Sequence, residues 1–326
     1  MKIRVAIGVF ISALFIYLAF HKVDFDQMVG ALQSANYRWL APAILVMLTS
    51  HWIRAVRWRA IMTPIKICHV HPLFSALMVG YAANNLLPLR LGEFLRAYAV
   101  GKSQTIPKTS AFATVIVERL LDLMALLLFL GVTVSLFPLP AEVKTPAYAV
   151  TVLTFALMIF VAFLMTKTDA TMSLVQKLLP QKIFSVVDKV MRSFVEGFEV
   201  FRKSEHYLLV ALTSVAIWLL YAGVVYLAFF AFDFQSRYGL GVYASLVVLV
   251  VISVGITIPS SPGYVGTYHW FCMLSLSLFG VPKSEALSFA IVSHAINVLP
   301  FTIIGLAYFW RENLSLSVAV AGEDAT

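Results

Sequence analysis

The composition of this chain excludes a soluble fold: 61% of its 326 residues are hydrophobic and 12% are charged, against roughly half and a quarter in soluble domains. The formal net charge of +8 would indicate a nucleic-acid partner only if the basic residues formed a water-facing patch. They gather instead at the ends of apolar runs, where cationic loops meet anionic lipid headgroups, so we expect the membrane as partner and no nucleic acid.

Six apolar runs approach the length of about 20 residues that a helix needs to cross a bilayer. The first, residues 4–20, resembles a signal peptide. It ends at Phe20 and is followed by His21 and Lys22 instead of a small-residue cleavage site, so we predict an uncleaved span. The other five runs are 39–58, 109–137, 146–166, 206–232 and 285–310. We expect one membrane domain over residues 1–312 and a flexible tail over 313–326.

Two further apolar stretches contain helix breakers. Residues 72–100 are interrupted by NNLLPLRLG at 84–92, and residues 241–279 by PSSPGYVG at 259–266. Proline removes a helical N–H and glycine weakens a helix, so each stretch is predicted to be a helix, a break and a second helix. Non-helical backbone at membrane depth survives only inside protein or beside water.

The distribution of basic residues predicts that both broken stretches are re-entrant. With a cytoplasmic N-terminus and six full crossings, most lysines and arginines fall on the cytoplasmic side, as the positive-inside rule requires. The C-terminus is then also cytoplasmic. The order span, broken pair, span occurs at 39–137 and again, entered from the other side, at 206–310, which predicts an all-α protein with an inverted-repeat arrangement.

Between these halves, residues 171–204 are predicted to form an amphipathic helix on the membrane surface, because apolar side chains recur there at helical spacing between charges. Cys68 and Cys272 have neither disulfide nor metal spacing and are interpreted as packing residues. We expect no cofactor and no metal. The sequence contains no Walker loop, no H-E-x-x-H and no nucleophile elbow, and Ser260 and Ser261 are interpreted as turn residues.

Charged residues cluster around the first break and in the span that follows it. They are Arg90, Glu93, Arg96, Glu118, Arg119 and Asp122. Each ion at mid-depth costs on the order of 2.5–3.5 kcal/mol, so these groups must pair or line an aqueous cavity. Two interpretations remain open: the charges neutralise one another and fix the re-entrant helix to the next span, or the arginines bind phosphate or carboxylate. By contrast, Arg54, Arg57 and Arg59 are predicted to lie at a helix end and reach the headgroups.

Both breaks are also candidates for anion binding through backbone N–H groups. A helix restarting at Gly92 would offer unpaired donors and a positive dipole end. The turn after Pro262 would do the same through Gly263, Tyr264 and Gly266. Further polar candidates near the breaks are Asn85, His269, His294 and Asn297, and for the histidines function and packing are weighed equally.

Three motifs in order carry a resemblance to a known family. They are Asn85-x-x-Pro88-x-Arg90-x-Gly92-Glu93-x-x-Arg96, Glu118-Arg119-x-x-Asp122 and Pro259-x-x-Pro262-Gly263-x-x-Gly266. Together they resemble the lysylphosphatidylglycerol synthase transmembrane (flippase-like) family, which includes the membrane half of the multiple peptide resistance factor. The resemblance implies a protein of a prokaryotic cytoplasmic (inner) membrane that translocates phospholipid or polyprenyl-linked lipid. The chain departs from the family pattern at Tyr264, where a second glycine is frequent, at His269, where a glutamate is, and near His294, where an arginine is.

We therefore predict a flippase-like transporter, not an enzyme, that holds the phosphate of an anionic phospholipid or polyprenyl-phosphate lipid between the breaks, near Arg90, Arg96 and the 263–266 turn. One alternative is an intramembrane transferase or hydrolase with Glu93, Glu118 or His269 as base. Another is a scaffold that positions a lipid synthase. The protein partners considered are accordingly a lipid synthase or a second copy of the chain.

Overall fold

The computed structural model describes residues 2–88, 91–136, 206–258 and 260–314, with isolated positions between 152 and 188. This part of the chain is helical and contains no strand, which confirms the all-α prediction. The residues outside the described part include Arg90, most of the expected span at 146–166, most of the expected surface helix at 171–204 and the tail beyond 314.

Five of the expected spans appear as helices. They are α1 (Lys2–Phe20), α3 (Leu40–Met62), α6 (Lys108–Leu136), α10 (Tyr207–Ala231) and α14 (Lys283–Arg311). The segment Tyr37–Met62, which adds the short turn η1 (Tyr37–Trp39) to α3, has the length and apolarity of a membrane crossing, as do α10 and α14. The 29 residues of α6 are also enough to cross. After α1 the chain bends by 87° into α2 (Phe25–Ser34).

Both stretches that were predicted to break do so. The first forms α4 (Val70–Leu86) and α5 (Gly92–Gln104), and the second forms α12 (Val242–Gly255) and α13 (Thr267–Ser277) with a short turn, η3 (Pro262–Tyr264), between them. Leu87 is extended before Pro88, as the residue before a proline prefers. Gly263 and Gly266 have φ of 66° and 89°, which glycine adopts without steric cost.

In each pair, the start of the first helix lies close to the end of the second helix. We call this the open end of the pair, opposite the break, and the contacts there show that the chain returns to the side from which it starts. Lys66, which precedes α4, donates through Nζ to the carbonyl oxygen of Gln104 at the end of α5, at 2.5 Å. Arg237 lies in α11 (Phe234–Tyr238), before α12, and pairs at 2.6 Å with Glu285, which follows α13. Each pair is therefore re-entrant.

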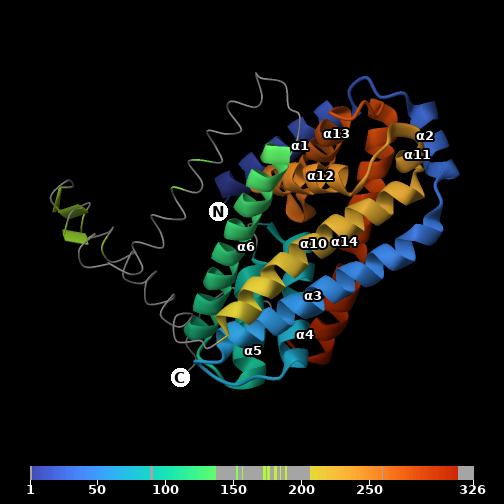
Figure 1. The fold of residues 1–326 in the computed structure, drawn as a ribbon. Helices are drawn as coiled ribbons and strands as arrows, with labels where there is room; N and C mark the ends of the chain where they lie inside the picture. The colour runs from blue at the N-terminus through green and yellow to red at the C-terminus, as the bar shows by residue number, and fades with distance from the viewer. Residues whose placement is uncertain are drawn as a thin grey trace.

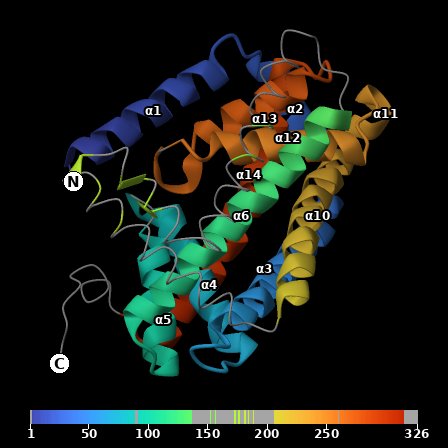
Figure 2. The same ribbon diagram turned by 60° about the vertical axis from the view of Figure 1, so that its left-hand side comes forward.

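The two pairs enter from opposite ends of the molecule (Figures 1 and 2). Glu285 lies in the first turn of α14. At the other end of this helix, the carbonyl oxygens of Glu312 and Asn313 accept hydrogen bonds from Lys102 of α5. The length of α14, about 43 Å at 1.5 Å per residue, thus separates the open ends of the two pairs. This arrangement fits the proposed inverted repeat, which remains a prediction.

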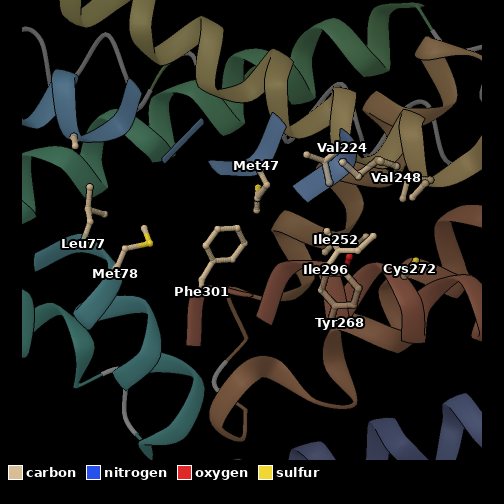
Figure 3. Packing of buried hydrophobic residues seen from close by; sticks show 14 of the residues in the cluster. Met47, Leu77, Met78, Val224, Val248, Ile252, Tyr268, Cys272, Ile296 and Phe301 are labelled. Carbon is tan, nitrogen blue, oxygen red and sulfur yellow. The ribbon is translucent and has the colours of Figure 1, made fainter. Parts of the chain in front are cut away.

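The core lies where α3 packs against α10 and α14 packs against α4 and α13. Figure 3 shows Phe301 of α14 among these apolar side chains, near Met47 of α3. Close approach of the helices depends on glycine: a Cβ at Gly305 would lie 2.1 Å from the carbonyl oxygen of Met78, and one at Gly92 would lie 2.0 Å from that of Gly80. Pro300 lies inside α14.

Candidate functional site

A cavity of about 230 Å³ lies where the two breaks meet α14. Seven of the predicted site residues line it: Asn85, Glu93, Arg119, Gly263, Tyr264, His294 and Asn297. Side chains far apart in the sequence therefore converge on one space at the point where the half-helices end.

Hydrogen bonds between α14 and each break hold both breaks in place at this cavity. Asn85 donates through Nδ2 to the hydroxyl of Thr302 at 2.9 Å. His294 Nε2 lies 2.7 Å from the carbonyl oxygen of Gly263. One helix thus fixes the first break about two turns away from the second.

The cavity is also lined by polar side chains that were not predicted to belong to the site. They include His51 and Arg54 from α3, Tyr81 and Asn84 from α4, and Tyr221 from α10. The ring of His51 packs against Tyr81 and Phe301 at centroid distances of 4.6 and 4.5 Å. Its Nδ1 is buried and has no hydrogen-bond partner among the described residues. The His51 side chain lines the cavity, but this nitrogen is itself enclosed.

A network of buried ion pairs adjoins the cavity at Arg54 and joins α3, α5 and α6. Arg54 contacts Glu118 at 2.9 Å and Asp122 at 2.8 Å. Arg57 contacts Asp122 at 2.6 Å and donates to Ser214 of α10 at 3.1 Å.

Arg96 completes this network from the re-entrant helix α5. It pairs with Glu118, and its guanidinium lies 3.6 Å from the centre of the Trp58 ring. Arg96, Glu118 and Asp122 therefore do not line the cavity. Their contacts correspond to mutual neutralisation, the first of the two interpretations left open by the sequence.

The prediction that Arg54 and Arg57 reach the headgroups was wrong. Both side chains are buried, whereas Arg59 is exposed. The helix α3 continues to Met62, so Arg54 and Arg57 do not lie at the end of the helix, and their side chains point into the protein. A signal was present in the sequence: His51, Arg54 and Arg57 follow one another at intervals of three, which places them along one face of a helix.

Arg119 differs from the other arginines. Its side chain is 43% exposed, and it lies 3.6 Å from Glu93 and from Asp122 and 3.8 Å from Glu118. These are ion pairs at longer range, and in the part of the chain that the structure describes its guanidinium makes no hydrogen bond. Arg119 is therefore the cation at the cavity that is best placed to bind a ligand.

The described ions around the cavity leave one positive charge in excess. Arg54, Arg57, Arg96 and Arg119 face the carboxylates of Glu93, Glu118 and Asp122. One uncompensated charge in a membrane interior is costly unless an anion neutralises it.

Three of the backbone donors that the breaks were expected to offer, at Gly92, Tyr264 and Gly266, already have partners. The N–H of Gly92 donates to the side-chain oxygen of Asn84 at 2.9 Å. The N–H of Tyr264 donates to the carbonyl oxygen of Ser261 at 3.0 Å, and that of Gly266 to Nδ1 of His269 at 3.4 Å. Gly263 contributes a carbonyl group to the contact with His294. These three N–H groups are therefore not free to bind an anion in this arrangement, and the expected anion site stays a prediction.

His269 and Gly266 lie behind the second break and do not line the cavity. The His269 ring is 4.8 Å from that of His294, centroid to centroid. Gly266 contacts α1 closely, since a Cβ there would lie 2.6 Å from the carbonyl oxygen of Ser12. In the same contact the N–H of Ser261 donates to the Ser12 hydroxyl at 2.7 Å. These residues position the turn.

Apolar spans and two re-entrant pairs around a buried charged cavity define a multi-pass membrane protein. Residues 5–305 match the family described as the lysylphosphatidylglycerol synthase TM region, and the chain belongs to that family. This confirms the resemblance that the three sequence motifs carried.

Similar proteins occur in archaea. The chain is 25% identical to glycosyltransferase AglD of Haloferax volcanii over 98% of its own length and 56% of that protein. It is 24% identical to a UPF0104 membrane protein of Methanocaldococcus jannaschii over 94% of its length and 95% of that protein. A UPF0104 membrane protein of Methanothermobacter thermautotrophicus is 28% identical over 81% and 80%. No solved structure matches the chain.

One of these relatives contradicts an expectation from the sequence. We predicted that the chain is not an enzyme, but a relative that it matches over 98% of its length is named a glycosyltransferase. The chain spans little more than half of that relative. The plain exclusion of enzymatic activity is therefore withdrawn.

Proposed function

We propose that this protein binds the phosphate of a lipid headgroup in the central cavity and moves the headgroup across the membrane. The observation that carries the proposal is that two re-entrant pairs, entering from opposite ends of α14, both contribute to the cavity wall. A site bounded in this way can exchange ligand with either leaflet if its two arrangements bind with different affinities. Anionic phospholipids and polyprenyl-phosphate lipids both carry the required group.

The charges at the cavity support a phosphate as the bound group. A phosphodiester carries one negative charge, which matches the single excess positive charge of the described cluster. The guanidinium of Arg119 is planar, permanently charged and suited to paired hydrogen bonds with phosphate oxygens.

Leaflet exchange in proteoliposomes tests this proposal. Fluorescent phospholipid or prenyl phosphate in the outer leaflet is bleached by an impermeant reductant, and the protected fraction reports transfer. We expect Arg119→Gln to lower the transfer rate at least tenfold, because a hydrogen bond to a charged group contributes about 1.5–3 kcal/mol. Arg59→Gln, an exposed arginine, is the matched control and should leave the rate unchanged. Absence of exchange by the unaltered protein with every lipid carrier would refute the proposal.

A second candidate function is glycosyl transfer at the same cavity, which the name of the Haloferax relative supports. In such a reaction the bond between the sugar and the phosphate of a lipid carrier breaks, and the acceptor oxygen bonds to the sugar. Glu93, which lines the cavity, takes the acceptor proton, and the phosphate leaves as an anion beside Arg119. Mass spectrometry of lipid extracts from cells that overproduce the protein tests this candidate. A glycosylated product that disappears with Glu93→Gln is expected, and an unchanged lipid profile would exclude it.

A further inference from the structure

A second compartment adjoins the central cavity inside the helix bundle. It measures about 170 Å³. Five residues belong to the walls of both spaces and form the boundary between them: Met47, Tyr221, Ile256, Tyr268 and Asn297. The two spaces are therefore neighbours that share side chains from α3, α10, α13 and α14 and the residue that ends α12.

The lining of the second compartment is less polar than that of the central cavity. The far wall of the second compartment consists mainly of Val224, Val225, Leu249 and Ile252. Figure 3 shows Ile252 of this wall close to Tyr268, one of the five shared residues. None of the ionised groups of the central cavity lines this compartment, so its far wall matches hydrocarbon and not a headgroup.

A mainly apolar space of this size is unfavourable when it is empty, so we expect a ligand to fill it. Protein interiors are close-packed, and unfilled volume forfeits contacts on every side. Water can bond the polar groups of Tyr221, Ser253, Tyr268 and Asn297 at its edges, but the apolar side chains of the far wall offer water no hydrogen-bond partner. Because the compartment joins the charged cavity, the occupant that fits both is the apolar portion of the same ligand.

We infer that the ligand of the central cavity is an amphiphile whose first chain segment lies in this compartment, enclosed by α3, α10 and α12. If each methylene group takes roughly the 30 Å³ that a water molecule takes in the liquid, the compartment holds about five or six methylene groups. The central cavity, smaller than the roughly 300–1,000 Å³ of pockets for drug-sized ligands, accepts a phosphate with a small substituent. The inference rests on the proposed function, because it assumes a phosphate in the central cavity.

Titration with n-alkyl phosphates from methyl to dodecyl tests the chain site. The protein is held in zwitterionic nanodiscs, and empty nanodiscs provide the background for calorimetry. We expect each methylene up to about the sixth to tighten binding three- to fourfold, as burial from water predicts, and no further gain beyond it. Methyl phosphate binding without chain-length dependence, or a gain that continues to dodecyl, would overturn the inference and leave the proposed function standing. Failure of every phosphate ester to bind would overturn both.

A matched pair of substitutions on α12 locates the chain. Ser253 lines the compartment, whereas its neighbour Val254 is 42% exposed on the outside of the bundle. Ser253→Phe should abolish the chain-length dependence and retain methyl phosphate binding, which also shows that the variant is folded. Val254→Phe should retain both. Equal chain-length dependence in the two variants would place the chain outside the compartment.

Discussion

Neutralisation of Glu118 is predicted to destabilise the fold far more than loss of a surface ion pair. This carboxylate is fully buried and lies within 4 Å of four arginines, Arg54, Arg57, Arg96 and Arg119. Glu118→Gln leaves Asp122 as the one acid that contacts Arg54 and Arg57 among the described residues. Removing one partner from a buried pair typically costs about 3–5 kcal/mol, because the remaining charge stays buried without compensation. We expect a loss in that range.

Unfolding in mixed micelles of mild detergent and dodecyl sulfate, followed by tryptophan fluorescence, measures this loss. Arg237→Gln is the control. Its side chain is 47% exposed and pairs with Glu285, so its removal should cost at most about 1 kcal/mol. The double variant Glu118→Gln with Arg96→Gln removes one charge of each sign, and we expect it to be more stable than the sum of the single losses predicts. A loss below about 1 kcal/mol for Glu118→Gln, or additive losses in the double variant, would refute the assignment of this network.

Three further predictions concern the breaks. Gly92→Ala places a Cβ 2.0 Å from the backbone oxygen of Gly80 and should lower the free energy of unfolding by about 1–3 kcal/mol or more. Gly30→Ala is the control, because a Cβ there meets no atom within 4 Å, and it should leave the free energy of unfolding unchanged in the same assay. Asn84→Ala removes the acceptor for the Gly92 N–H and should cost about 1 kcal/mol, and an unchanged unfolding midpoint would contradict this. In a background without cysteine, Lys66→Cys and Gln104→Cys should react with an impermeant maleimide from one side of the membrane and Arg237→Cys from the other. Labelling of all three from one side would contradict the opposed re-entrant pairs.

The breaks could be predicted from the sequence because their causes are local. Pro88 forces an extended residue before it, and Gly263 and Gly266 adopt positive φ at no steric cost. Breakers inside an apolar stretch, together with the placement of basic residues, then indicate re-entrance. Convergence of the two breaks follows from the need to shield their polar backbone from lipid.

The partners within the site depend on tertiary packing, which local patterns do not encode. The spacing of Arg54, Arg57 and Arg59 is equally compatible with a helix end at the headgroups and with a buried face. The structure separates them, because α6 presents Glu118 and Asp122 to the face that carries Arg54 and Arg57. In the same way, the donor at Gly92 is used by a side chain eight residues earlier, across the break.

The position of Pro300 has a consequence for how the molecule can move. It lies between His294, which contacts the second break, and Thr302, which accepts from the first. Proline cannot supply the N–H that would bond the carbonyl four residues earlier, so α14 bends most easily at this point. Bending at Pro300 would change the distance between the two re-entrant pairs while both hydrogen bonds to α14 stay formed. The cavity would then open further toward one side of the membrane as it narrows toward the other.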